Sequence, residues 1–575
     1  MISLLKYLKN YKLNSILAPL FKLLEASFEL LVPIIVAMII DNGIVGGEGQ
    51  NYVINMFIIL AVLGVVGFAS ATCAQYFSAR AAVGFAKGLR HDLFAKMQSF
   101  SFKLLDDVGT SAMITRITSD VNQIQTGVNL VLRILLRSPF IVFGAMICAY
   151  VIDVLAGNVL LITIILLFAV VFIIMFITVP LYKKAQSGLD DVTVLMRQNL
   201  KGVRVVRAFC KEDDEIKTYE TANQSLTKSN LLAGAISALT NPLTYVIVNA
   251  GLIALIYVGA IKVDSGVLTQ GQIVALYNYM TQILVELIKF ANLIITVTKS
   301  FACAGRINEI LSVDTSLNYA DDLEKSNHYV SFKNVYLSYH DNGEYALEDL
   351  SFDVEKGETV GIIGGTGSGK SSLVNLIARF YDATKGKIFV DGKDVTSFNE
   401  VDLRNMCGIV PQKAVLFSGT IKENLLWGNE NATDEEIETA LELACADDVV
   451  RSKENGINSL VEQGGRNFSG GQRQRLTIAR TLVKKPEILI LDDSASALDY
   501  ATDARLRKNV KSLGYNPTVF IVSQRTSSIM HADKIIVLDD GKMVGYGSHD
   551  DLLKNCSIYK EIYDYQYGGQ DENQV

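Results

Sequence analysis

The chain has 575 residues, half of them apolar, and a mean hydropathy of +0.28, which is high for a soluble protein. Its net charge of −7 argues against a nucleic-acid-binding protein. The seven cysteines form no CxxC pair and no metal-ligand spacing, which indicates reduced thiols and argues against a disulfide framework. Long charge-free stretches are confined to roughly the first 300 residues, and the remainder has the composition of a soluble α/β domain.

The N-terminal stretch MISLLKYLKNYKLN places its lysines on one side of a helix and its leucines on another. This pattern predicts a short helix at the membrane surface over residues 1–12, with a frayed terminus as the alternative. The sequence contains no apparent cleavable signal peptide.

Six apolar runs are long enough to cross a bilayer, for which a helix needs about 20 residues. They predict a multi-pass α-helical domain over residues 13–315. The six expected spans cover about residues 16–40, 53–76, 131–152, 158–182, 242–261 and 272–298.

The connections between these spans alternate between short and long. Nearly all Lys and Arg residues of these connections lie in the two long ones, about residues 78–130 and 183–241, which places them in the cytosol together with both termini. They have helical periodicity, so we expect the spanning helices to continue beyond the membrane. The expected turning points, around residues 106–111 and 201–209, could contact a cytosolic domain.

Charged residues stand inside three of the spans, and the third span carries Arg133 and Arg137 near its start. Glu25 and Glu29 lie four residues apart, on one face of the first span, and Glu286 and Lys289 lie in the sixth. Charges at membrane depth are costly and usually face an aqueous path or an oppositely charged partner. The three glutamates therefore either line a path for a cationic or polar substrate, or form interhelical pairs, for example with Lys289.

The C-terminal part contains a phosphate-binding motif. The stretch VGIIGGTGSGKSSLVNLIARF predicts a strand, a glycine-rich loop and a helix, and residues 364–371 match G-x-x-x-x-G-K-S. Backbone N–H groups of such a loop surround phosphates, the lysine neutralises their charge, and the serine hydroxyl ligates Mg²⁺. The expected ATP-binding residues here are Gly364, Gly365, Thr366, Gly367, Ser368, Gly369, Lys370, Ser371 and Ser372.

A second half of the same site follows a buried strand, EILILDD. A continuous apolar run is typical of a parallel strand covered on both faces. Asp492 at its end is expected to hold Mg²⁺ directly or through water. A second carboxylate, Asp493, follows at once.

The order of motifs resembles the ATP-binding cassette (ABC) transporters. The phosphate loop is followed by VPQ, then by FSGGQRQR, then by LILDD and SALD. The chain is similar to a half-transporter of the exporter type, with six spans fused to one cassette. The resemblance implies an α/β P-loop nucleotide-binding domain over residues 316–565, followed by a polar, disordered tail over residues 566–575.

The resemblance also assigns roles to residues of this chain. Tyr339 matches the aromatic residue that stacks on adenine, and Gln412 matches the loop glutamine that senses the γ-phosphate and Mg²⁺. Asp499 matches the loop that crosses the interface between two cassettes, and the two turning points match the coupling helices. The signature motif, which contacts ATP bound to the opposing cassette, matches Ser469, Gly470, Gly471 and Gln472.

Two catalytic positions depart from the family pattern. The position of Asp493 usually holds glutamate, and retreat by one methylene moves the carboxylate by roughly 1.3 Å. Gln524 stands where the family usually has a histidine, and an amide cannot exchange a proton as imidazole does. We therefore expect weak hydrolysis at this chain's own site and a heterodimer in which a partner supplies both groups. A homodimer in which Asp493 works slowly is the alternative.

The leading functional prediction is ATP-driven efflux of an amphipathic, drug-like or lipid-like compound across the cell membrane. A dedicated lipid or peptide exporter and an ATP-gated channel or regulatory subunit are the alternatives. The expected cofactors are ATP and Mg²⁺. The expected partners are a second half-transporter, the lipid bilayer and a small amphipathic substrate, without nucleic acid.

Overall fold

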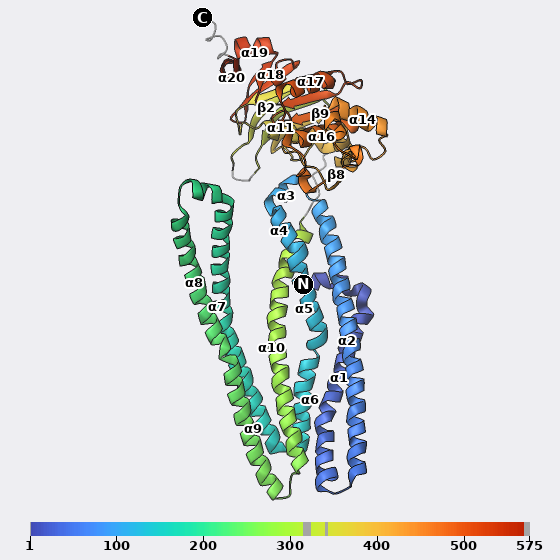
Figure 1. Ribbon diagram of the computed structural model, residues 1–575, viewed down its shortest axis with the longest axis vertical. Coiled ribbons are helices and arrows are strands. Elements are labelled where there is room, and N and C mark those ends of the chain that lie inside the picture. Colours follow the sequence, from blue (N-terminus) through green and yellow to red (C-terminus); the bar gives the residue numbers. More distant parts are fainter. Residues whose placement is uncertain (1, 314–323, 340–342, 568–575) are drawn as a thin grey trace. The chain divides into compact units, whose positions relative to one another are not determined.

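The computed structural model describes residues 2–313, 324–339 and 343–567. The chain forms two compact units (Figure 1). One comprises Met1–Ser99 and Thr110–Val313, and the other comprises Phe100–Gly109 and Asp314–Val575. The expected domain boundary at 315/316 and residues 568–575 of the expected tail lie outside the described residues.

The first unit is all-helical and contains six helical segments that are long and apolar enough to span a membrane. Each segment includes one of the expected spans, which confirms the six-span domain. The segments extend well past the apolar runs, because the polar parts of both long connections are themselves helical. The segments are Ser3–Val45, Gln50–Gln98, Thr110–Ile152, Val154–Ala208, Glu212–Asp264 and Gln270–Ser312.

Several of these segments are composed of consecutive helices. The described elements, in chain order, are η1 (Ile2–Tyr11), α1 (Lys12–Met38), η2 (Ile39–Val45), α2 (Gln50–Gln98), α4 (Thr110–Thr115), η3 (Arg116–Asp120), α5 (Val121–Ile134), α6 (Arg137–Ile152), α7 (Val154–Ala208), α8 (Glu212–Ala238), α9 (Thr240–Asp264) and α10 (Gln270–Ser312).

The turning points of the two long connections differ from each other. The first contains a short helix, α3 (Phe102–Val108), which ends at Gly109 with φ +73° and belongs to the second unit. The second predicted segment, residues 201–209, is mostly the last part of α7, and the chain reverses at residues 209–211 before α8 begins. Continuous helical hydrogen bonding through Ala208 shifts this turn toward the C-terminus of the predicted segment.

The second unit contains a mixed sheet of six strands in the order β12-β11-β3-β10-β9-β6. All neighbours are parallel except β12, which pairs antiparallel with β11. The strands are β3 (Thr359–Gly364), β6 (Cys407–Val410), β9 (Ile488–Asp492), β10 (Thr518–Val522), β11 (Lys534–Asp539) and β12 (Lys542–Gly547). Every residue of β9 is buried, as its apolar run predicts.

A second, antiparallel sheet has the order β2-β1-β4-β5, and a small hairpin pairs β7 with β8. These strands are β1 (Val330–Leu337), β2 (Leu347–Val354), β4 (Lys385–Val390), β5 (Lys393–Asp394), β7 (Gly419–Thr420) and β8 (Leu460–Val461). Residues from the two larger sheets and from α11 (Lys370–Ile377) share one apolar core. These elements form an α/β nucleotide-binding domain and complete the expected fold class.

A separate core holds the helical part of this unit, around α13 (Ile421–Leu426), α14 (Asp434–Leu443) and α16 (Gly470–Val483). The remaining helices are η4 (Val395–Ser397), α12 (Glu400–Met406), α15 (Asp447–Arg451), η5 (Gly456–Asn458), η6 (Gln463–Gly465), α17 (Tyr500–Lys511), α18 (Thr526–Ile529), α19 (His549–Asn555) and α20 (Ser557–Tyr567). Because α20 runs to Tyr567, Gln566 belongs to a folded helix and not to the polar tail that the sequence predicts from residue 566.

The parallel strands direct their carboxyl ends to one edge of the sheet. The phosphate loop follows β3, Asp493 follows β9, Gln524 lies two residues after β10, and Gln412 lies two residues after β6. These four strands are consecutive in the sheet. Ligands of open α/β sheets bind outside this edge, so the fold gathers four groups that are up to 160 residues apart in the sequence, from Gly364 to Gln524.

Candidate functional site

The phosphate loop connects β3 to α11 and requires glycine at specific places. A Cβ at Gly364 would lie 2.1 Å from the carbonyl oxygen of Leu538, so the loop leaves the sheet where a side chain has no room. Gly367 and Gly369 have φ of +86° and +94°, the left-handed region that favours glycine. A Cβ at Gly365 would meet no heavy atom of the described chain within 4 Å, which leaves open space for a ligand beside the loop.

The polar groups of the loop fit a phosphate ligand. Lys370 Nζ donates to the carbonyl oxygens of Gly364 (2.9 Å) and Gly365 (2.5 Å), which keeps its charge over the loop. Burial holds the pKa of Lys370 below its usual value, although the nearby charges of Asp493 and Asp492 raise it. The Ser368 hydroxyl is buried and has no hydrogen-bond partner within the described residues. A phosphate placed against these groups would satisfy both.

Ser371 and Asp492 lie together at the start of α11 and the end of β9. Ser371 Oγ donates to Asp492 Oδ1 over 3.0 Å, so the two expected Mg²⁺ ligands are adjacent. Burial raises the pKa of Asp492, the hydrogen bond from Ser371 lowers it, and the charge of Asp493 raises it further. A hydroxyl beside a carboxylate is an oxygen donor set that suits Mg²⁺, so these residues fit the ion.

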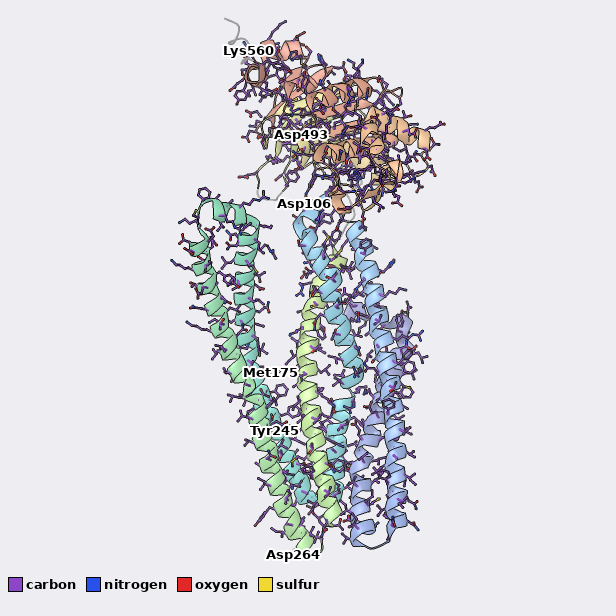
Figure 2. All side chains as sticks on the ribbon, in the orientation of Figure 1. Asp106, Met175, Tyr245, Asp264, Asp493 and Lys560 are labelled. Atoms are coloured by element: carbon purple, nitrogen blue, oxygen red, sulfur yellow. The ribbon has the colours of Figure 1, made fainter. Side chains whose placement is uncertain are left out.

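The second carboxylate, Asp493, has an unusual backbone conformation with φ of +46°. Among residues with a side chain, Asp and Asn adopt this left-handed region most readily. The Asp493 N–H donates to the Val522 carbonyl (3.0 Å), and its Oδ2 accepts a long 3.3 Å hydrogen bond from Gln412 Nε2. The structure thus brings Asp493 and Gln412 together at the sheet edge (Figure 2 labels Asp493).

Gln524 lies in the segment between β10 and α18, and its side chain is exposed. The preceding residue, Ser523, is fixed by donation from its N–H to the carbonyl of Ile362 in β3 over 3.0 Å. The position of β10 between β3 and β9 therefore carries Gln524 between the phosphate loop and Asp492. None of the described histidines occupies this place.

Tyr339 is half-buried and its hydroxyl donates to Ser372 Oγ over 2.8 Å, which joins it to the first turn of α11. Its ring meets Tyr381 edge to face, with centroids 5.0 Å apart. Burial raises the pKa of Tyr339. The contact of Tyr339 with the phosphate-loop helix is consistent with an adenine platform, and no sequence pattern indicates Tyr381.

The short helix α3 packs on the same aromatic group. Phe102 stacks on Phe380 with centroids 4.2 Å apart, and Tyr381 donates its hydroxyl to Asp106 Oδ2 over 2.6 Å. A cavity of about 470 Å³ lies between them, lined by Lys103 of α3 and by Tyr339 and Tyr381. The first turning point therefore contacts the nucleotide-binding domain beside Tyr339, within the unit to which both belong.

The signature residues form the N-terminus of α16. Ser469 is its N-cap, and a capping box joins Ser469 Oγ to the Gln472 N–H (3.3 Å) and Gln472 Oε1 to the Ser469 N–H (2.9 Å). Ser469 accepts in this cap and keeps its hydroxyl proton for another acceptor. No heavy atom of the described chain lies within 4 Å of a Cβ built at Gly470, and Ser469 and Gly470 are exposed. Nothing among the residues that the structure describes therefore demands glycine at position 470.

Asp499 is the N-cap of α17 and its Oδ2 accepts from the Thr502 N–H over 3.2 Å. The hydrogen bonds from Thr502 lower the pKa of Asp499. The residue is exposed, as a loop that meets another subunit requires, but capping alone also accounts for an aspartate here.

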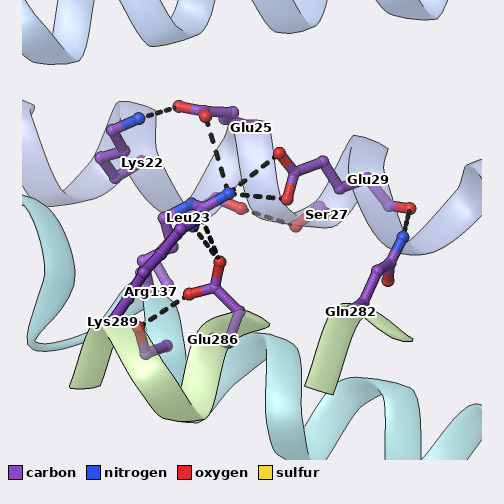
Figure 3. A network of polar contacts seen from close by, with 10 residues as sticks. Lys22, Leu23, Glu25, Ser27, Glu29, Arg137, Gln282, Glu286 and Lys289 are labelled. Carbon is purple, nitrogen blue, oxygen red and sulfur yellow. Dashed lines mark hydrogen bonds and ion pairs between the residues drawn. The ribbon is translucent and has the colours of Figure 1, made fainter. Parts of the chain in front are cut away.

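Six charged residues inside the spans form one network centred on Arg137 (Figure 3). Arg137 contacts Glu286 of α10 over 2.5 Å and both oxygens of Glu29 of α1 over 2.9 and 2.7 Å. Arg137 is about 22 Å along α6 from Ile152, which is within a bilayer core of about 30 Å. The network therefore ties three spans together at membrane depth.

Two lysines and a serine complete this network. Lys22 binds Glu25 over 2.5 Å, Lys289 binds Glu286 over 2.9 Å, and the Ser138 hydroxyl donates to Glu286 over 2.7 Å. Three acidic and three basic side chains balance each other. The side chains of Glu25 and Glu286 are 12% and 4% exposed, whereas that of Glu29 is 42% exposed. The expected pairing with Lys289 is present, and Glu29 is the most exposed of the three glutamates.

Family models and curated relatives match this chain along most of its length. The model described as "ABC transporter transmembrane region" matches residues 15–287, and the model described as "ABC transporter" matches residues 347–496. The chain is 34% identical over 565 residues to the uncharacterized ABC transporter ATP-binding protein YfiB of Bacillus subtilis, covering 98% of each chain. It is 29% identical over 586 residues to the putative multidrug export ATP-binding/permease protein YgaD of the same organism, again covering 98% of each.

A solved structure gives the same picture of the fold. The structure of a bacterial Atm1-family ABC exporter with ATP bound superposes with a TM-score of 0.80 at 25% sequence identity. The match covers 97% of this chain and 98% of that one.

Removal of the central arginine should strongly destabilise the membrane unit. Arg137→Leu leaves Glu286 without its arginine partner in a buried site, and we expect a loss of about 3–5 kcal/mol, measured by thermal unfolding in detergent or nanodiscs. Lys211→Ala is the matched control, because the Lys211–Asp214 pair is exposed (63% and 61%) and should change stability by less than about 1 kcal/mol. Equal effects of the two variants would contradict the assigned weight of the network.

Proposed function

Because the chain belongs to the ABC exporter family, as a half-transporter with one membrane domain and one ATP-binding domain, we propose that it is one subunit of a heterodimeric, ATP-driven efflux pump. It binds ATP at its own phosphate loop, hydrolyses it poorly there, and completes the partner's active site with its signature motif. The observation that carries this division is that loop and signature are both intact while the two groups that act on water and the γ-phosphate are Asp493 and Gln524.

The binding half of the site is fully built. Lys370 and the loop N–H groups bind the phosphates, and Tyr339 stacks on the adenine base. Ser371, Asp492 and Gln412 would hold Mg²⁺, which would neutralise phosphate charge when bound. The tight closure of the loop against β11, where Gly364 approaches Leu538, keeps these donors in place.

The two residues at the catalytic positions, Asp493 and Gln524, support ATP hydrolysis poorly because of their geometry and chemistry. The Asp493 carboxylate is one methylene short and accepts a long hydrogen bond from Gln412. A well-placed general base contributes about 10²–10⁴-fold, and much of this depends on its position. Gln524 can hydrogen-bond the γ-phosphate but cannot carry a proton. The left-handed backbone conformation at position 493 is an independent, local reason for an aspartate there. This reason does not involve a partner subunit, so it is compatible with the slow homodimer.

The exposed signature points to a second cassette. The hydroxyl proton of Ser469 is not used in the cap. Position 470 is a glycine although the described residues leave room for a side chain there. A helix N-terminus with a serine and unshielded N–H groups attracts an anion. A γ-phosphate held between two cassettes favours their closed arrangement, and hydrolysis releases it.

The substrate is proposed to be amphipathic, drug-like or lipid-like, with transport across the cell membrane and both termini cytosolic. The name of one relative, a putative multidrug export protein, supports this class. A dedicated lipid or peptide exporter and an ATP-gated channel remain the alternatives. ATP-dependent accumulation against a gradient in inverted vesicles supports the pump, whereas an ATP-dependent passive conductance would identify a channel.

Restoring the two catalytic groups should raise hydrolysis at this site. We expect Asp493→Glu combined with Gln524→His to increase ATP turnover at least about tenfold in a complex whose partner site has been inactivated. Asp493→Asn in the otherwise intact complex should change total turnover little. A brisk ATPase formed by the unmodified chain alone would contradict the proposal.

Blocking the signature should impair activity without loss of stability. Gly470→Val adds a side chain where the described chain leaves open space, so thermal stability should stay within about 0.5 kcal/mol of the original. ATP turnover by the assembled transporter should fall at least about tenfold, because the side chain enters the space of the partner's nucleotide.

Gly428→Ala is the control for this variant. Its Cβ would lie 2.2 Å from the Arg480 carbonyl oxygen, so it should lose stability by about 1–3 kcal/mol through overpacking. Full turnover by the Gly470→Val transporter would show that the signature does not meet nucleotide.

A further inference from the structure

Residues 523–526, which follow β10 and carry Gln524, are called the switch segment here. This segment is held by a residue from the C-terminal helix. Gln566, in the last turn of α20, accepts hydrogen bonds from the Thr526 N–H (2.8 Å) and the Thr526 hydroxyl (2.7 Å) through its Oε1. Its Nε2 donates to the Gln524 carbonyl oxygen over 2.8 Å. One side-chain amide thus binds both sides of the switch segment from 40 residues away.

The segment itself offers no substitute for these contacts. Thr526 begins α18 and is fully buried, so its N–H needs a partner. The N-cap residue, Arg525, makes no side-chain cap, and Ser523 Oγ is used by the Arg525 N–H over 3.0 Å. Gln566 therefore supplies the cap that the local sequence lacks.

These bonds fix Gln524 from both directions. Ser523, before it, donates to the Ile362 carbonyl of β3, next to the phosphate loop. The Gln524 carbonyl, after it, is held by Gln566. The side chain of Gln524 stays exposed, so the backbone is restrained while the amide remains free to meet a ligand.

The helix that carries Gln566 is itself firmly attached. Tyr559 of α20 is fully buried in one core with Ile363 of β3 and Ile529 of α18, and its hydroxyl lies 2.7 Å from His549 Nδ1. Tyr567 contacts the sulfur of Met530 at 4.0 Å. The core that supports the phosphate-loop strand β3 thus also supports α20, the helix that carries Gln566.

We propose that Gln566 is a positioning residue that holds the switch segment so that Gln524 reaches the γ-phosphate of ATP bound at this chain's phosphate loop. The inference rests on the proposed function, which gives Gln524 its contact with the γ-phosphate. Through it, the C-terminal helix sets how strongly the site distinguishes ATP from ADP.

The amide chemistry gives a variant that separates positioning from mere capping. Gln566→Glu keeps an oxygen acceptor for Thr526, where a negative charge at the start of α18 is tolerated. It replaces the donor to Gln524 by a second oxygen, which repels the Gln524 carbonyl. This variant should retain the cap and displace Gln524, whereas Gln566→Ala loses both contacts.

The test measures the affinity of the full chain, assembled with its partner where one is required, for Mg-ATP and Mg-ADP. Each nucleotide displaces a fluorescent trinitrophenyl nucleotide, and thermal unfolding is recorded in parallel. We expect Gln566→Glu to weaken ATP binding about three- to tenfold, the range for one lost hydrogen bond, with ADP binding and the melting temperature unchanged. Gln524→Ala should reproduce this effect, and adding Gln566→Glu to it should cause no further loss.

Lys560→Ala is the matched control, because Lys560 is exposed on the same helix (Figure 2) and should alter neither affinity. Equal weakening of ATP and ADP by Gln566→Glu, or no weakening of either, would overturn the positioning role. If this chain does not bind ATP at its phosphate loop, as the proposed function requires, the result differs: Lys370→Ala would then bind Mg-ATP as well as the unmodified chain does.

Discussion

The shared direction of four adjacent parallel strands is the constraint on which the nucleotide site depends. β3, β10, β9 and β6 end at one edge of the sheet, and each is followed within two residues by a group that the chemistry needs. The backbone hydrogen bonds of the ladder, such as Asp493 N–H to the Val522 carbonyl, fix the spacing between those groups. Buried apolar strands thereby position polar residues without requiring the polar residues to hold each other.

The electrostatics of the two units follow different rules. At the sheet edge, polar groups remain partly unsatisfied within the described residues: the Ser368 hydroxyl lacks a partner, and the hydrogen bonds of the Lys370 ammonium go to the carbonyls of Gly364 and Gly365. Such a site gains interaction energy when an anion arrives. Inside the membrane unit, Arg137 is paired with Glu286 and Glu29, because an uncompensated charge at that depth is costly. The first arrangement favours ligand binding, and the second favours a fixed packing of helices.

Under the proposed function, a site that binds ATP better than it hydrolyses it would suit a subunit that holds the closed state. The interaction of Gln412 with Asp493, the cap provided by Gln566 and the packing of α3 beside Tyr339 all act on geometry and not on proton transfer. Tyr381 joins Tyr339, the proposed adenine platform, to Asp106 of α3 within the nucleotide-binding unit.

The sequence by itself determined the six spans and the α/β nucleotide-binding domain, because these are encoded by local hydrophobicity and by contiguous residues with fixed backbone demands. The magnesium ligands, the signature and the two catalytic departures stay predictions from the sequence. Only the tertiary structure decided that Glu25 and Glu286 are paired through Arg137, that the second turn comes at residues 209–211, and that Gln566 belongs to a helix bound to the switch segment. These facts depend on contacts between residues distant in the chain, whose side chains carry no local pattern that reveals their partners.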